Sequence, residues 1–172
     1  MVSILFFTFC QDRNKAISKN VIDTFIKKHQ AESFLEFKNT IIFIRQETLL
    51  STLYVIHRYE GNSPVYFVTY NKIKNEITEI DDSLLKKLKV PDYFTAREIT
   101  SLIKRFRSYE ICMVGVDMQE NVFINPFYPN NPAVFLRMSK HSQLNISKIQ
   151  GNYVHYKDRW YVDKSQLVGV KL

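Results

Sequence analysis

The most informative stretch of the sequence is Thr95-Ala-Arg-Glu-Ile-Thr-Ser-Leu-Ile-Lys-Arg-Phe-Arg107. Both the beginning and the buried face of a helix can be predicted from its residues. Thr95 and Glu98 stand at the spacing of a capping box, in which each side chain accepts a hydrogen bond from the other residue's backbone N–H. Phe94 lies one position before this box and is placed for a hydrophobic staple with Ile99. The pattern predicts an amphipathic helix over residues 95–107. Its apolar stripe consists of Ile99, Leu102, Ile103 and Phe106.

Segments rich in β-forming residues flank this helix on both sides, and several are joined by links short enough for hairpins. A second amphipathic helix is expected over residues 16–29, and a short helix is expected before Pro91. The predicted strands before the central helix cover residues 34–45, 49–59, 64–71 and 76–80. Those after it cover residues 110–117, 121–125, 133–138, 153–156 and 160–163.

Each half of the chain thus consists of a helix followed by antiparallel strands. We predict an α+β fold in which amphipathic helices pack on antiparallel β-meander sheets. Residues 11–172 are expected to form a single α+β domain. Two small lobes that meet near residues 85–91 are the alternative.

Length and composition limit the class of protein. A chain of 172 residues provides one domain or two small ones. Hydrophobic residues make up 45% of it, and four glycines and five prolines are too few for a disordered or collagen-like chain. No apolar stretch approaches the roughly 18 residues that a membrane-spanning helix needs. Two cysteines are too few for a disulfide framework.

Several kinds of ligand site are excluded by missing motifs. Phosphate-binding loops need closely spaced glycines, and the four glycines of this chain are widely separated. The four histidines and two cysteines show none of the close spacings of zinc sites. We therefore predict no cofactor and no metal. The glycines are Gly61, Gly115, Gly151 and Gly169, and the histidines are His29, His57, His141 and His155.

The first ten residues, Met-Val-Ser-Ile-Leu-Phe-Phe-Thr-Phe-Cys10, form an apolar run that ends at a cysteine and is followed by polar residues. This pattern resembles the signal peptide of a bacterial lipoprotein, in which the cysteine is lipidated. The resemblance implies a protein of the cell envelope that contacts a membrane only through an anchor at Cys10. No basic residue precedes the run, and Phe9 stands where a small residue is usual. A buried first strand in a cytoplasmic protein is the alternative interpretation.

Much of the positive charge lies between residues 86 and 107, where seven basic side chains stand against two acidic ones, in a chain with a net charge of +7. Arg97, Lys104 and Arg105 lie off the apolar stripe of the predicted helix and are expected to point to solvent. Such a surface attracts phosphates or acidic proteins, with an affinity that falls as salt rises. A solvated helix face without a ligand is the simpler interpretation. The basic residues are Lys86, Lys87, Lys89, Arg97, Lys104, Arg105 and Arg107.

Two aromatic segments are further candidates for recognition. Residues 125–132 contain three of the five prolines, which predicts a stiff loop that presents Phe127 and Tyr128. A loop whose aromatic rings tuck under the sheet is the alternative. Residues 153–161 predict an aromatic hairpin, in which Trp160 is an interface anchor if it is exposed and a structural residue if it is buried.

The sequence offers little support for catalysis. Cys112 is a candidate nucleophile, but it lies in the apolar run 111–116, whereas a catalytic thiolate needs an electropositive, partly exposed setting. We therefore expect a non-enzymatic binding protein, either an envelope lipoprotein or an inhibitor- or immunity-type protein, whose partner presents an acidic surface to residues 86–107. A basic nucleic-acid-binding module and an enzyme with a site assembled from scattered residues are the alternatives.

Overall fold

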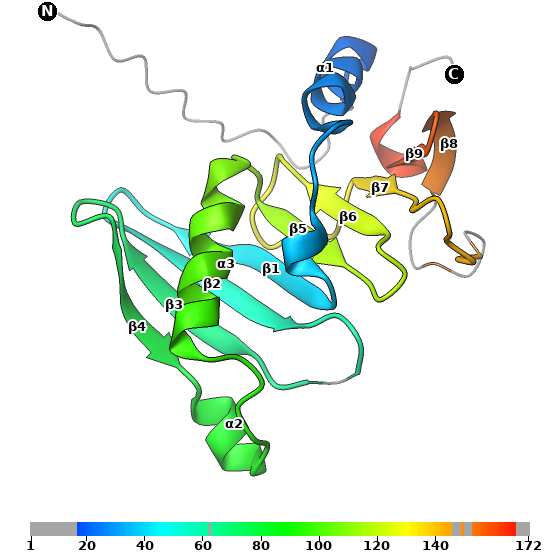
Figure 1. Cartoon of the computed structure of the whole chain (residues 1–172). Helices are drawn as coiled ribbons and strands as arrows, with labels where there is room; N and C mark the ends of the chain where they lie inside the picture. Colours follow the sequence, from blue (N-terminus) through cyan, green and yellow to red (C-terminus); the bar gives the residue numbers. More distant parts are fainter. Residues whose placement is uncertain (1–16, 62, 146–148, 150–152, 168–172) are drawn as a thin grey trace, which may run out of the picture.

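The structure is a computed structural model that describes residues 17–61, 63–145, 149 and 153–167 (Figure 1). Within these ranges, nine antiparallel strands form one sheet, and three α-helices accompany it. The predicted combination of helices with antiparallel strands is confirmed, and strands predominate. No helix in these ranges is long and apolar enough to cross a membrane. Cys10 lies outside the described residues, so both interpretations of the N-terminus stay open.

The strands lie across the sheet in the order β4-β3-β2-β1-β5-β6-β7-β9-β8. The first four strands are a meander, and β8 and β9 form a hairpin at the opposite edge. In chain order the elements are α1 (Lys19–His29), η1 (Leu35–Phe37), β1 (Thr40–Glu47), β2 (Ser51–Arg58), β3 (Tyr66–Asn71), β4 (Glu76–Asp81), α2 (Ser83–Leu88), α3 (Ala96–Ser108), β5 (Met113–Val116), β6 (Val122–Asn125), β7 (Phe135–Arg137), β8 (Tyr153–Lys157), β9 (Trp160–Asp163) and η3 (Lys164–Gln166).

Strand β1 joins the two halves of the chain, because it pairs with β2 on one side and with β5 on the other. Thr40 of β1 stands opposite Arg58 of β2 and opposite Val116 of β5. The chain leaves the meander at β4, passes through α2 and α3, and returns to the middle of the sheet at β5 (Figure 1). Residues 85–91 therefore lie in α2 and in its link to α3, while the sheet is continuous.

Helix α3 forms where the sequence predicts it. Thr95 is its N-cap, and the Glu98 carboxylate accepts a hydrogen bond from the Thr95 N–H with an N–O distance of 2.7 Å, which completes the capping box. The four residues of the predicted apolar stripe are all buried. The ring of Phe106 meets Tyr54 of β2 edge-on, with ring centroids 5.8 Å apart. This burial leaves the opposite side of α3 to solvent.

Helix α1 belongs to the other half of the sheet (Figure 1). Phe25 of α1 stacks on Phe135 of β7 with ring centroids 4.3 Å apart, and it meets Trp160 of β9 edge-on at 6.0 Å. All three rings are buried in the main hydrophobic core. The aromatic residues of the β8–β9 hairpin and of α1 thus contribute to one core.

Two predicted strands begin three or more residues later than the sequence suggested. In the segment 34–45 the strand starts at Thr40, after a 3-10 turn. Phe34 and Phe37 are both buried, and a strand would point residues three apart to opposite faces. A 3-10 turn repeats every three residues and brings both rings to the same side. The strand predicted from residue 110 starts at Met113, because Glu110 has a left-handed backbone with a φ of 55° directly after α3.

Candidate binding surface on helix α3

Arg97 and Lys104, two of the seven basic residues predicted to bind a partner, lie on the solvent side of α3, and their side chains have no partner within the described residues. They are seven positions apart, which places them two helical turns apart on the same side, with Ser101 between them. All three side chains are exposed, and neither cation forms a hydrogen bond or an ion pair with any described residue. We call Arg97, Ser101 and Lys104 the α3 crest.

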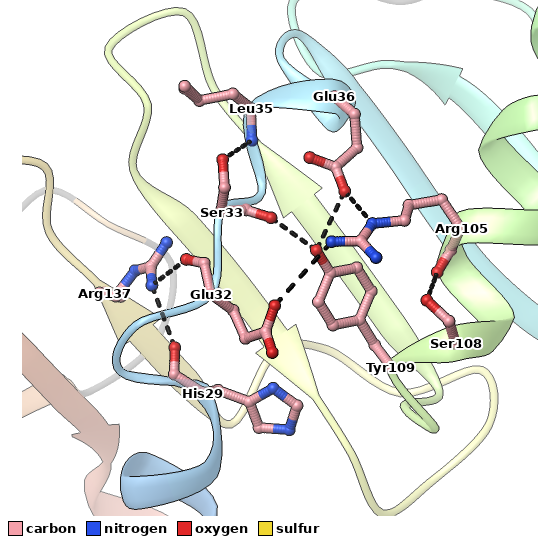
Figure 2. A network of polar contacts seen from close by, with 9 residues as sticks. All are labelled: His29, Glu32, Ser33, Leu35, Glu36, Arg105, Ser108, Tyr109 and Arg137. Carbon is pink, nitrogen blue, oxygen red and sulfur yellow. Dashed lines mark hydrogen bonds and ion pairs between the residues drawn. The ribbon is translucent and has the colours of Figure 1, made fainter.

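Arg105 follows Lys104 directly but turns to one side of the helix, toward the segment between α1 and β1 (Figure 2). Its Nε lies 2.6 Å from an Oε1 of Glu36, and its Nη2 lies 3.9 Å from Glu32 Oε2. The guanidinium also lies 4.7 Å above the ring of Tyr109. Arg105 is therefore engaged within the protein, where it links α3 to residues 32–36.

Tyr109 completes this link at the end of α3 (Figure 2). Its hydroxyl oxygen lies 2.5 Å from the Ser33 carbonyl oxygen and 3.0 Å from the Glu36 carboxylate, and these two acceptors share its single proton. Burial, followed by the hydrogen bond to Glu36, raises the pKa of Tyr109 to about 12. The hydroxyl therefore stays protonated at neutral pH and keeps its donor role.

Two other predicted residues also have partners within the molecule. The Arg107 guanidinium lies 3.7 Å above the ring of Tyr70 and donates to the Tyr70 hydroxyl and to Asn75. Lys86 of α2 pairs with Asp82 at 2.7 Å.

Lys87 and Lys89 remain exposed and have no partner among the described residues. They lie in α2 and directly after it, and α2 extends beyond the end at which α3 begins (Figure 1). The two lysines therefore add positive charge near that end of the crest but do not belong to it.

A hollow of about 520 Å³ runs beside the crest and shares Arg97 and Ser101 with it. Its far wall contains Arg58 of β2, a residue that sequence reasoning missed. The Nη2 of Arg58 donates to the Tyr93 carbonyl at 3.0 Å, and its guanidinium lies 4.4 Å above the ring of Phe94. Stacking on a ring fixes the guanidinium plane and leaves its other N–H groups for a ligand. A lone arginine at the end of a strand gave no signal for this role.

The hollow is lined by more positive than negative charge, with four basic and two acidic side chains. Glu36 is occupied by Arg105 and Tyr109. Glu98 is occupied by the capping box, and the Thr95 backbone N–H lowers the pKa of its carboxyl group. Arg58 and Arg97 therefore carry the charge that is free to meet an anion. This arrangement suits a carboxylate or a phosphate.

The predicted aromatic loop lies elsewhere in the molecule. Phe127 and Tyr128 are half-buried, and the Phe127 ring lies 6.1 Å from the buried ring of Phe135. The side chain of Asn125 accepts hydrogen bonds from the N–H groups of both residues, which makes the loop rigid. Phe127 therefore packs against the main core. This agrees with the alternative prediction, in which the aromatic rings of the loop pack against the sheet.

Trp160 and Cys112 also lie away from α3. Trp160 is 2% exposed and packs inside the core, which is its structural role in the hairpin. Cys112 is half-buried, and burial raises the pKa of its thiol to about 11. At neutral pH this thiol is protonated. No cluster of histidine, cysteine and carboxylate side chains that could hold a metal occurs in the described ranges.

Comparison with protein-family models, with curated proteins and with solved structures finds no match for this chain. The candidate site is therefore defined by its own geometry. It consists of an exposed, unpaired cationic crest on a capped helix and of a hollow beside it that contains a stacked arginine.

Proposed function

We propose that this protein is a non-enzymatic binding protein that docks on the acidic surface of a partner protein through the α3 crest and the adjacent hollow. The observation that carries the proposal is the contrast between neighbouring cations. Arg105, Arg107 and Lys86 are held by groups of the same chain, whereas Arg97 and Lys104 are not. Unpaired cations on a rigid helix attract an acidic surface and steer its approach.

The way the crest is held supports a docking role. The capping box fixes the beginning of α3, and its apolar stripe is buried, so the crest side chains extend from a fixed backbone. A preorganised surface loses less conformational entropy when it binds. Arg58 adds a stacked guanidinium in a partly enclosed position, and arginine is among the residues that dominate interface energies.

The surface composition favours a protein over a single-stranded nucleic acid. Single strands are bound by exposed aromatic rings on which bases stack. In the described ranges the large hydrophobic side chains that are most exposed are aliphatic, such as Leu49, Leu50 and Ile73. The setting of the partner, in the cell envelope or in the cytoplasm, stays a prediction.

A pair of charge reversals tests the proposal. The variant Arg97→Glu/Lys104→Glu reverses the crest, and the variant Lys19→Glu/Lys27→Glu makes the same change of net charge on the exposed side of α1. Binding of a fluorescent poly-glutamate peptide is measured for both variants and the wild type by anisotropy, with short mixed-sequence DNA and RNA in parallel. Low salt, about 50 mM, makes weak electrostatic binding visible.

The location of the charge decides the outcome. We expect the crest variant to bind poly-glutamate at least about tenfold more weakly, because attraction at two sites becomes repulsion, and the α1 variant to stay close to the wild type. Equal losses in both variants would show that net charge alone attracts the probe and would contradict a docking site on α3. Tighter binding of DNA or RNA than of poly-glutamate, lost in the crest variant, would favour the nucleic-acid alternative.

A further inference from the structure

A second basic site lies on the other side of the segment that follows α1. A pocket of about 370 Å³ is lined by residues 30–35, by residues between 116 and 122, by residues 137 and 139–141 and by Arg159. Three basic side chains line it, from Arg137, Lys140 and Arg159. Neither Arg97 nor Lys104 is among its lining residues. The pocket is thus separate from the surface assigned to protein docking.

Arg137 is a half-buried cation of this pocket. Its Nη1 donates to the carbonyls of His29 at 3.2 Å and Glu32 at 2.9 Å. Its guanidinium lies 4.9 Å from the ring of Phe34 and 5.6 Å from that of Trp160. No carboxylate among the described residues pairs with it. A half-buried cation without a carboxylate partner is a candidate for binding an anion.

The surroundings add further unpaired donors. Ser139 lines the same pocket, and its Oγ is buried without a hydrogen-bond partner. Arg159 donates one N–H to the Met138 carbonyl at 3.2 Å and has no carboxylate partner in the described ranges. Burial, and after it the positive charge of Arg159, lower the pKa of Arg137 to about 10. The two guanidinium groups therefore repel each other across this site.

The carboxylates that line the pocket form their ion pairs with cations outside it. Glu32 points its carboxylate toward Arg105, with a distance of 3.9 Å to Nη2, and Glu120 pairs with Lys38 at 2.9 Å. Both therefore interact with cations that lie outside the pocket.

We propose that the Arg137 pocket binds the phosphate group of a small phosphate monoester. Guanidinium groups bind phosphate through paired N–H donors, and the Ser139 hydroxyl and the Lys140 ammonium supply further donors. A phosphate monoester is close to a dianion at neutral pH, which matches a site with more than one unpaired cation. Phe34, Val116 and Val122 provide an apolar wall for the organic part of the ligand. The volume of the pocket lies within the range typical of small-molecule sites.

The single tryptophan of the chain provides a direct readout. Trp160 packs beside the Arg137 guanidinium, so an anion that binds Arg137 is expected to change the fluorescence of Trp160. The probes are phenyl phosphate, inorganic phosphate and benzoate, titrated into the full chain. We expect phenyl phosphate to bind most tightly, because it offers both the dianion and an apolar body. Thermal unfolding in the presence of each probe gives an independent measure of binding to the native state.

Three variants and one control locate the binding. Arg159→Gln removes the donors of an exposed side chain, and Ser139→Ala removes the buried hydroxyl. Arg137→Lys keeps the charge but removes the fork of N–H groups. Each is expected to weaken phenyl phosphate about tenfold, the effect of losing one charge-assisted hydrogen bond. The control Arg45→Gln removes an exposed arginine that donates to Asn130 outside the pocket, and it should bind like the wild type. The variant Arg97→Glu/Lys104→Glu should also bind phenyl phosphate like the wild type. This result would distinguish the phosphate site from the surface proposed for protein docking.

Several results would overturn the proposal. Absence of both a fluorescence change and a thermal shift with phenyl phosphate at millimolar concentration would show that the pocket is no such site. Wild-type affinity in both Arg159→Gln and Ser139→Ala would place the phosphate elsewhere. Benzoate binding as tight as that of phenyl phosphate would contradict the assignment to phosphate monoesters.

Discussion

Replacement of Tyr109 by phenylalanine tests how the segment between α1 and β1 is held against α3. The substitution removes one oxygen atom and keeps the ring, which stacks on Phe34 with centroids 4.6 Å apart and lies under the Arg105 guanidinium. The Ser33 carbonyl and the Glu36 carboxylate then lose the single hydroxyl proton that they share. Every other contact of the ring can persist, so the measured effect belongs to the hydroxyl.

The size of the effect follows from the two acceptors. A hydrogen bond to a charged group contributes about 1.5–3 kcal/mol to stability. The upper end does not apply, because the side chain of Glu36 is 32% exposed and keeps its ion pair with Arg105. We therefore expect Tyr109→Phe to lower the free energy of unfolding by about 1–2 kcal/mol. For a chain of this size, that corresponds to a melting temperature lower by about 2–8 °C.

Urea unfolding followed by circular dichroism measures this difference, provided that the slope with urea is unchanged. Tyr128→Phe is the matched control, because the Tyr128 hydroxyl has no hydrogen bond among the described residues, and its free energy of unfolding should change by less than about 0.5 kcal/mol. If Tyr109→Phe were as stable as Tyr128→Phe, the Tyr109 hydroxyl would not help to hold the segment against α3 (Figure 2).

Two further predictions concern the N-terminal cap of α3 and alkaline pH. Thr95→Ala removes the cap acceptor for the Glu98 N–H and should lower the free energy of unfolding in urea by about 1 kcal/mol. Thr100→Ala, on the exposed side of α3, should have little effect. Equal stabilities of the two variants would show that the cap does not stabilise the helix. Burial raises the pKa of several tyrosines above the ordinary value of 10. The stability that these protonated tyrosines contribute is therefore complete below pH 10 and is lost as the pH rises through about 12. The protein should accordingly become less stable above about pH 10. Ultraviolet titration of tyrosinate in the folded and the urea-unfolded chain measures this, and identical titration curves would refute it. The tyrosines whose pKa is raised to about 12 are Tyr59, Tyr93, Tyr109 and Tyr156.

Local signals in the sequence predicted most elements of this fold. The capping box and the apolar stripe of α3 are short-range patterns, and short links predicted the hairpins of the meander. The sequence failed where an apolar run did not alternate. Phe34 and Phe37 looked like strand residues, but their spacing of three suits a 3-10 turn that buries both rings. The pairing of β1 with β5 could not be predicted either, because it joins residues seventy or more positions apart.

The candidate sites were predictable only in part. Helical periodicity placed Arg97, Lys104 and Arg105 on the solvent side of α3, yet it gave no means to tell the free cations from the paired one. The partners of Arg105 are Glu32 and Glu36, which lie about seventy residues away in the sequence and reach it only through the fold. The Arg137 pocket combines residues from four separate segments and therefore left no motif.

The two basic sites differ in burial, and this difference makes them separable by salt. The α3 crest is exposed, so its attraction for an acidic surface is screened beyond about 8 Å at physiological ionic strength. Arg137 is half-buried between aromatic rings, where water screens charge less and a ligand forms direct hydrogen bonds. Binding of an acidic partner at the crest should therefore weaken steeply as salt rises, whereas a phosphate at Arg137 should lose less affinity over the same range. An exposed surface with salt-dependent attraction suits the encounter with a large partner, and a partly enclosed cation suits the selection of a small ligand.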